Sequence, residues 1–131
     1  MTILKNTPYD RLAVGMEAEA RRICAADDLY VFAHASGNMN PMHIPEADGD
    51  GDGDGEALAP AAWVGSLISA VLGNSLPGPG TVYESQTLNF RGRAHEGDEL
   101  VIRVRLTEKM ADRRVRFATS VAHADGTGIV D

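Results

Sequence analysis

Two stretches in the second half of the chain alternate apolar and polar residues with a period of two. Residues 99–107 (ELVIRVRLT) and 115–121 (VRFATSV) show this alternation, which is typical of strands with one wet face. A polar turn over residues 109–113 joins them and predicts an antiparallel hairpin. Weaker patterns predict strands over residues 14–23 and 82–90, and the last seven residues predict a turn followed by an incomplete C-terminal strand.

The segment 61–74 (AAWVGSLISAVLGN) is apolar on nearly every face, with Ser66 and Ser69 as its polar positions before a Gly-Asn stop. A helix of this kind is a buried helix, and it would be about 20 Å long. Since the sheet is the large apolar surface available to cover it, the fold class is α+β, an antiparallel sheet wrapped around one long buried central helix. A shorter helix is predicted from Asp27, as its N-cap, to a stop at Gly37.

Composition fits one soluble domain spanning residues 1–131. The chain has a mass of 14.0 kDa, 44% hydrophobic residues and no apolar run near the roughly 20 residues of a membrane-spanning helix. Its formal net charge of -7 argues against a nucleic-acid partner, and the sequence indicates no membrane partner. A single cysteine, Cys24, and an N-terminus without a secretory pattern predict a cytoplasmic location.

A strict Asp-Gly alternation lies within residues 46–57. Such a segment buries nothing and repels itself, so we expect a mobile surface loop there. A calcium loop is the alternative, because EF-hand loops begin with alternating acids. The two possible frames place Ala59 or Ala61 where the bidentate Glu belongs, and no helix precedes the run. We therefore predict no metal site.

The densest cluster of polar chemistry is the segment 32–43 (FAHASGNMNPMH). Pro41 and Pro45 exclude regular helix around His43 and hold it between rigid positions. The segment resembles the F-A-x-x-S-G-D-x-N-P-x-H motif of MaoC-type (R)-specific 2-enoyl-CoA hydratases. Residues 66–81 and 90–100 resemble the central helix, exit turn and following strand of the same family. The resemblance covers about residues 12–122 and implies the hot-dog fold.

The resemblance also implies an activity. Family members hydrate trans-2-enoyl-CoA to (R)-3-hydroxyacyl-CoA, usually as homodimers, with the coenzyme A thioester as substrate and no further cofactor. Trp63 and Gly65 in particular resemble the version that precedes a phosphate acetyltransferase domain, which implies fusion to, or association with, such a domain.

Carried onto this chain, the family pattern implies a set of site residues. His43 is the acid/base, Asn40 helps to place the loop or water, Ser69 orients His43, and the backbone N–H of Ala61 is the oxyanion donor. Asn38 stands where the family has Asp, and an amide cannot take a proton from water. We expect this change to impair hydration. The expected substrate-binding residues are Arg91 and Arg93, which would meet the CoA phosphates, and Trp63.

Other interpretations stay open for each feature. Asn38 and Asn40 also suit a turn, His43 could cap its loop, and the arginines could be solvated. His34, His95 and His123 lack a partner pattern and are interpreted as surface or turn residues, and Cys24 as a small core or strand residue. The rival functions are a non-catalytic acyl-CoA-binding or dimerisation module of a larger acyltransferase, and a hot-dog thioesterase. The thioesterase ranks last because residues 61–74 contain no Asp or Glu.

Overall fold

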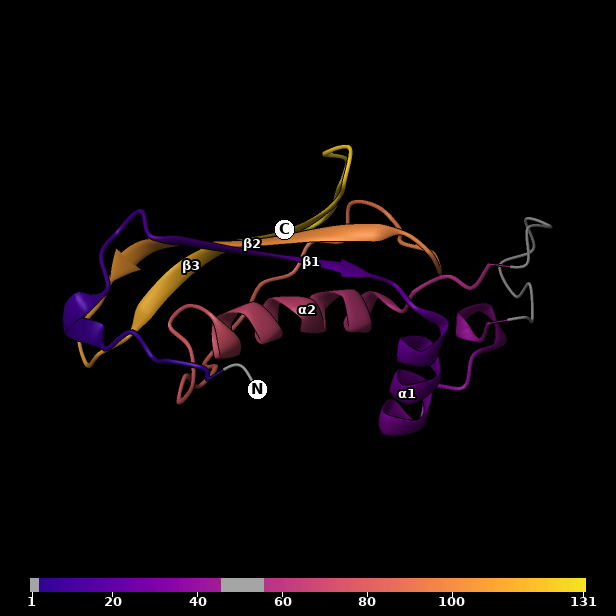
Figure 1. The fold of residues 1–131 in the computed structure, drawn as a ribbon, viewed down its shortest axis with the longest axis horizontal. Helices are drawn as coiled ribbons and strands as arrows, with labels where there is room; N and C mark the ends of the chain where they lie inside the picture. The colour runs from indigo at the N-terminus through magenta and orange to yellow at the C-terminus, as the bar shows by residue number, and fades with distance from the viewer. Residues whose placement is uncertain (1–2, 46–55) are drawn as a thin grey trace.

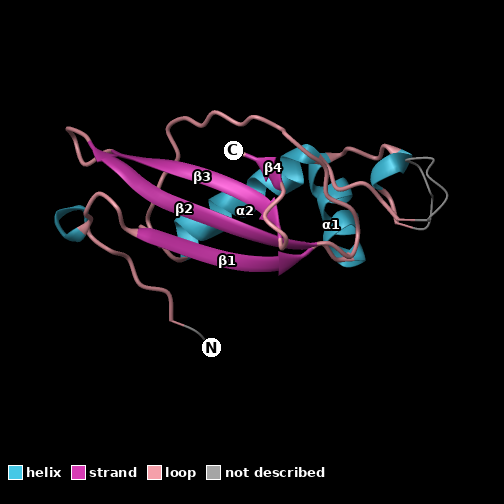
Figure 2. Ribbon diagram, turned by 90° about the horizontal axis from the view of Figure 1, so that it is seen from above, coloured by secondary structure: helices cyan, strands magenta, loops and turns pink. Residues whose placement is uncertain are grey.

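The computed structural model describes residues 3–45 and 56–131, in which four strands form one antiparallel sheet. The strands β1 (Glu17–Ile23), β2 (Glu99–Lys109), β3 (Val115–His123) and β4 (Gly128–Val130) lie side by side in chain order (Figure 2). Each neighbouring pair is antiparallel. The predicted hairpin, the strand within residues 14–23 and the short C-terminal strand are confirmed.

The helix α2 (Ala61–Asn74) crosses one face of the sheet with the bounds that its sequence predicts (Figure 1). Apolar side chains of α2 interdigitate with the inward residues of β2 and β3 and form the main core, whose members include Trp63, Val64, Leu67, Ile68, Leu100, Ile102, Val104 and Val121. Full burial of one such side chain is worth about 1.5–3 kcal/mol. The contact between sheet and helix is therefore the main stabilising layer of the fold.

The expectation that α2 is buried on every side is wrong for the single chain. Ala62, Ser66, Ser69 and Ala70 are exposed and share one face of the helix, opposite the face that contacts the sheet. The sheet curves around only part of the helix circumference, so it leaves this row of small side chains uncovered. Ser66 satisfies its hydroxyl locally, because Oγ donates to the carbonyl oxygen of Trp63 at 2.6 Å.

The strand predicted over residues 82–90 is not formed, apart from its last residues. Phe90 makes an isolated bridge with Val130, and the backbones of Asn89 and Asp131 exchange two hydrogen bonds of 2.8 and 3.1 Å. Val82 and Tyr83, further upstream, are exposed. A strand forms only where its backbone groups can pair with those of a neighbouring strand. Among the described residues, the segment 82–90 finds such a partner only at Asn89 and Phe90, which pair with Asp131 and with Val130 of β4.

A second helix, α1 (Ala26–Ser36), lies beyond one end of the sheet (Figure 1). It begins two residues earlier than predicted, with Ala25 as its N-cap in place of Asp27. The reason is the carboxylate of Asp28, whose Oδ2 accepts the Ala25 N–H at 3.3 Å from the third helical position. The predicted stop is confirmed, since Gly37 closes the helix with φ of 78° in the left-handed region.

The predicted loop over 46–57 lies largely outside the described residues, so neither its mobility nor the calcium alternative can be placed on the structure. Its last position is not loop-like, because Ala57 is fully buried and its carbonyl oxygen accepts the Glu96 N–H at 2.8 Å. None of the described helices has the length and hydropathy to cross a membrane.

Candidate functional site

A chain of short-range hydrogen bonds builds the loop that leaves α1. The Ser36 hydroxyl accepts the N–H of Asn38 at 3.1 Å, the Asn38 Oδ1 accepts the N–H of Asn40 at 3.2 Å, and the Asn40 Oδ1 accepts the N–H of Met42 at 3.3 Å. Each bond spans two residues, which is the geometry of Asx turns and of their serine equivalent. Three consecutive turns therefore carry the chain to His43.

The loop ends in a single 3-10 turn, η2 (Pro41–His43), that presents the imidazole of His43. The ring Nδ1 lies 2.7 Å from the carbonyl oxygen of Leu58. Because a carbonyl oxygen only accepts, Nδ1 carries the proton in the neutral ring, and Nε2 keeps its lone pair. No described residue forms a hydrogen bond with Nε2, so this nitrogen is available to a ligand.

His43 forms part of the wall of a cavity of about 390 Å³ between the start of α2, the segment 90–94 and β4. The lining is mainly apolar or backbone: His43, Leu58, Ala59, Ala61, Val64, Phe90, Arg91, Gly92, Arg93, Ala94, Ile129 and Val130. A half-buried imidazole whose Nε2 has no partner among the described residues, in a cavity lined otherwise by apolar residues, backbone and two arginines, is suited to proton transfer on a small organic group.

The N-terminus of α2 also opens on this cavity. Ala61 is the first residue of the helix, and none of the described groups accepts a hydrogen bond from its backbone N–H. The orphan N–H groups at a helix N-terminus, together with the helix dipole, stabilise negative charge. His43 and Ala61, two of the residues expected from the sequence, thus line one cavity.

The two predicted phosphate-binding arginines line the same cavity but differ in their partners. Arg91 forms an exposed two-point ion pair with Asp131, with Nε–Oδ2 and Nη2–Oδ1 distances of 3.3 and 3.4 Å. The guanidinium of Arg93 forms no ion pair with any residue of 3–45 or 56–131. Arg93 is therefore the more available cation at the cavity mouth.

Four other predicted site residues do not line this cavity. Trp63 is 5% exposed and belongs to the core, not to the cavity wall. Ser69 is on the exposed face of α2 and makes no described hydrogen bond with His43, whose ring is oriented by the Leu58 carbonyl instead. Asn38 does not line the cavity, and its Oδ1 is engaged in a turn, as is that of Asn40.

Sequence reasoning missed one residue beside the site. His123 was interpreted as a surface or turn residue, but it is half-buried at the end of β3, and its Nε2 lies 2.9 Å from the Arg93 carbonyl oxygen. The partner is a backbone atom 30 positions away, for which the sequence carries no signal. Only its predicted inward position in an alternating strand could have drawn attention to it.

Cys24 is confirmed as a core residue without catalytic features. Its thiol is fully buried, and burial, reinforced by the charges of Asp28, Asp98 and Glu96, raises its pKa to about 12. A thiol that stays protonated at neutral pH is a poor nucleophile. Among the described residues, no group of three acidic, histidine or cysteine side chains has the geometry to hold a metal ion.

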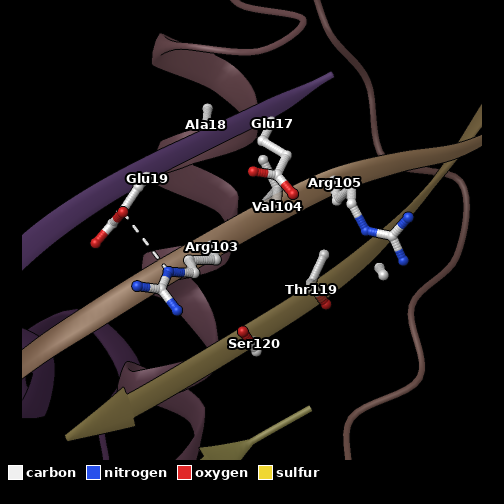
Figure 3. A pocket seen from close by; sticks show the side chains of 9 residues that line it. Glu17, Ala18, Glu19, Arg103, Val104, Arg105, Thr119 and Ser120 are labelled. Carbon is white, nitrogen blue, oxygen red and sulfur yellow. Dashed lines mark ion pairs between the residues drawn. The ribbon is translucent and has the colours of Figure 1, made fainter. Parts of the chain in front are cut away.

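A shallow groove of about 440 Å³ lies on the outer face of the sheet, away from His43. Figure 3 shows its lining, in which glutamates of β1 lie beside arginines of β2 and small side chains of β3 lie on the other side of β2; Arg103 Nε lies 3.6 Å from Glu19 Oε2. Exposed pairs of this kind contribute little to stability, about 0–1 kcal/mol. The groove holds no imidazole and no free backbone donor at a helix end, so it is not the candidate site.

Known proteins were compared with the chain. No protein-family model matches it. It is 38% identical over 118 residues to a 3-hydroxybutyryl-CoA dehydratase of Methylorubrum extorquens, covering 89% of this chain and 75% of the relative. It is 30% identical over 113 residues to an (R)-specific enoyl-CoA hydratase of Rhodospirillum rubrum, covering 86% and 78%.

Solved structures agree with this relationship. The R-hydratase PhaJ1 of Pseudomonas aeruginosa superposes with a TM-score of 0.90 at 40% identity, over 96% of this chain and 81% of the other. The (R)-hydratase of Aeromonas caviae gives a TM-score of 0.82 at 28% identity, over 91% of both chains. The predicted hot-dog fold is confirmed. With its His43 loop, its central helix and this degree of identity, the chain belongs to the MaoC-like (R)-specific enoyl-CoA hydratase family.

Proposed function

We propose that the chain hydrates trans-2-enoyl-CoA to (R)-3-hydroxyacyl-CoA, and that its rate is reduced by the amide at position 38. The observation that carries the proposal is the imidazole of His43, which lines the cavity, whose Nδ1 is held by the Leu58 carbonyl and whose Nε2 has no hydrogen bond to a described residue. Support comes from the relatives, whose names describe hydratases and dehydratases of acyl thioesters.

In the proposed reaction, water adds across the C2=C3 double bond of the substrate. The lone pair of His43 Nε2 takes a proton from water, whose oxygen forms the new bond to C3. The electron pair of the double bond moves towards the thioester carbonyl, where the Ala61 N–H and the helix dipole stabilise the developing negative charge. The imidazolium then returns the proton to C2, so His43 ends the cycle neutral.

Asn38 lies outside the cavity lining of the single chain, so its role in the proposal rests on the resemblance, which implies an acid at this position; an amide has no basic oxygen that can take a proton at neutral pH. A positioned acid or base contributes about 10²- to 10⁴-fold to a rate, so losing one of two such groups lowers hydration by about this range. His43 remains as a single group with an imidazole suited to both steps. Arg93, and Arg91 when released from Asp131, would bind the CoA phosphates at the cavity mouth.

The test is hydration of crotonyl-CoA, followed by the loss of the absorbance of its conjugated double bond. We expect a slow rate above that of buffer, which His43→Asn abolishes. His34→Asn is the matched control, because His34 is an exposed imidazole on α1 outside the cavity. A wild-type rate equal to buffer, or a His43→Asn rate equal to wild type, would contradict the proposal.

The second candidate is a non-catalytic acyl-CoA-binding or dimerisation module of a larger acyltransferase, such as a phosphate acetyltransferase. The amide of Asn38 favours it, since a module that only binds has no use for a proton acceptor there. Calorimetric binding of crotonyl-CoA without turnover would favour the module over the hydratase.

We also propose a homodimer. The uncovered face of α2 (Ala62, Ser66, Ser69 and Ala70) and the exposed side chains of Val82, Tyr83 and Phe90 are apolar or small. Val82 is 82% and Phe90 52% exposed in the single chain, which is costly for side chains of this type. Phe90 also lines the cavity, so a second copy on this side would cover part of the site.

A further inference from the structure

His123 connects the sheet to the wall of the cavity. It is the last residue of β3, and its Nε2 lies 2.9 Å from the carbonyl oxygen of Arg93. The carbonyl can only accept, so Nε2 carries a proton and donates it to Arg93. On its other side, Nδ1 lies 3.9 Å from Oδ2 of Asp98, an oxygen that also accepts the His95 N–H at 2.8 Å. The imidazole is thus set between two points of the segment 93–98.

Arg93 belongs to the stretch 90–94 that forms one wall of the cavity. The backbone N–H groups of Arg91 and Gly92 are bonded to the Ile129 carbonyl at 2.7 and 3.2 Å, so β4 holds the start of this stretch. The His123 side chain donates to the carbonyl of the following residue, Arg93. His123 itself does not line the cavity, so any effect on a bound substrate must pass through this wall.

The wall is connected in turn to His43. The Ala59 N–H donates to the Ala94 carbonyl and the Glu96 N–H donates to the Ala57 carbonyl, both at 2.8 Å. Leu58, between these two alanines, donates its N–H to Met42 at 2.8 Å and accepts from His43 Nδ1 at 2.7 Å. Three hydrogen bonds, His123–Arg93, Ala59–Ala94 and His43–Leu58, are therefore joined by single steps of backbone into one connection between the two imidazoles.

We infer that His123 is a positioning residue. It fixes the position of the segment 93–96 and, through Leu58, the orientation of the His43 ring. The inference rests on the proposed function only for its effect on rate, since the orientation of His43 can be measured without substrate. Removal of the Nε2 donor would take away the side-chain partner of the exposed Arg93 carbonyl and loosen the start of the segment 93–96. A shift of the Leu58 carbonyl would weaken the bond that keeps the proton on Nδ1 of His43.

The test compares two variants of the full chain. His123→Gln keeps a donor near the place of Nε2, whereas His123→Leu removes it at similar volume. Misplacement of a catalytic group by a distant change lowers rates by up to about 10²-fold, so we expect kcat of the Leu variant for crotonyl-CoA to fall between about tenfold and 100-fold, with KM within about threefold of wild type. The Gln variant should keep kcat within about threefold. His34→Leu is the matched control and should match wild type.

A second measurement is independent of turnover. Long-range ¹H–¹⁵N spectra of histidine-labelled protein distinguish the two neutral tautomers, and wild-type His43 should show the form protonated at Nδ1. We expect the Leu variant to show a mixture of tautomers at His43, and the Gln variant to keep the wild-type pattern. A wild-type His43 pattern in the Leu variant would overturn the inference, as would loss of the pattern in both variants. If wild type has no hydratase rate, the proposed function fails while this measurement still decides the role of His123.

Discussion

At the residue scale, the side chain at position 38 of the Ser36–His43 loop can have two roles, accepting a backbone N–H in the turn and taking a proton from water. The Oδ1 of Asn38 accepts a backbone N–H, and a carboxylate oxygen accepts it equally well. The backbone of the turn is therefore the same whether position 38 carries an amide or an acid. Proton transfer at this position differs between the two, because only the acid can take a proton from water.

We predict that Asn38→Asp raises the hydration rate of crotonyl-CoA by about 10²- to 10⁴-fold, because it adds a proton acceptor without disturbing the turn. Asn40→Asp is the matched control, since Asn40 makes the same type of turn two residues later and gains the same charge. Steady-state kcat/KM for the three proteins is the measurement. An equal increase in both variants would point to a general effect of charge and contradict the assignment to position 38.

A second prediction concerns the buried thiol of Cys24. Burial raises its pKa in the fold from the ordinary 9.0 to about 12, so the thiol of the unfolded chain ionises first as pH rises. The stability that the neutral thiol contributes is fully present below pH 9 and is lost between about pH 9 and 12, at up to about 1.4 kcal/mol per pH unit. Urea unfolding from pH 7 to 10.5 should therefore show a steeper alkaline loss in wild type than in Cys24→Ala.

Parallel stability curves for the two proteins would contradict the assignment to Cys24. The substitution also removes packing, which displaces the Cys24→Ala curve at every pH. It is therefore the difference in slope, and not in height, that tests the prediction.

At the element scale, the turn after α2 is fixed by a close approach of two backbones. Gly78 has φ of 98°, and a Cβ built there would lie 2.5 Å from the carbonyl oxygen of Lys5. Beside it, the Thr7 N–H donates to the Pro77 carbonyl at 2.7 Å. The N-terminal segment is thus attached to the end of the central helix at a point where no side chain fits.

We predict that Gly78→Ala lowers the free energy of unfolding more than Gly80→Ala. Both positions have positive φ, which costs a residue with a Cβ about 1–2 kcal/mol. Gly80 has open space around it, whereas Gly78 adds a clash with backbone worth about 1–3 kcal/mol more. Urea unfolding of both variants measures the difference, and equal losses would contradict it.

Local patterns of apolar and polar residues were enough to predict α2 and the β2–β3 hairpin. The bounds of α2 are confirmed because its apolar run ends at Gly73 and Asn74, and the β2–β3 hairpin is confirmed because its alternation is clean. The strand over 82–90 failed because pairing depends on a neighbour, which sequence alone does not reveal. The same applies in the site, where His43 bonds to Leu58 and His123 to Arg93 across 15 and 30 positions, for which no local pattern exists.

At the scale of the whole molecule, one chain leaves its central helix half covered. The exposed row on α2 and the apolar side chains of 82–90 lie on surfaces that a second copy can bury. The net charge of -7 does not oppose this, because none of the residues in these two surfaces except Glu84 is charged.

We predict that the wild type sediments as a dimer of the 14.0 kDa chain and that Ala70→Glu sediments as a monomer, because a carboxylate on the exposed face of α2 could not be buried without a partner. Val14→Glu is the matched control: Val14 is also exposed, at 61%, but lies in the turn before β1. It should leave the dimer intact. A monomeric wild type at all concentrations would contradict the proposed dimer.

The three consecutive turns of the Ser36–His43 loop have a consequence for how such a protein can change over generations. Codons for asparagine and aspartate differ by one nucleotide, and the turn at position 38 accepts either residue with the same backbone. A lineage can therefore lose and regain the acid through single point mutations, without passing through a misfolded intermediate. The backbone of the loop therefore stays the same whichever of the two residues stands at position 38.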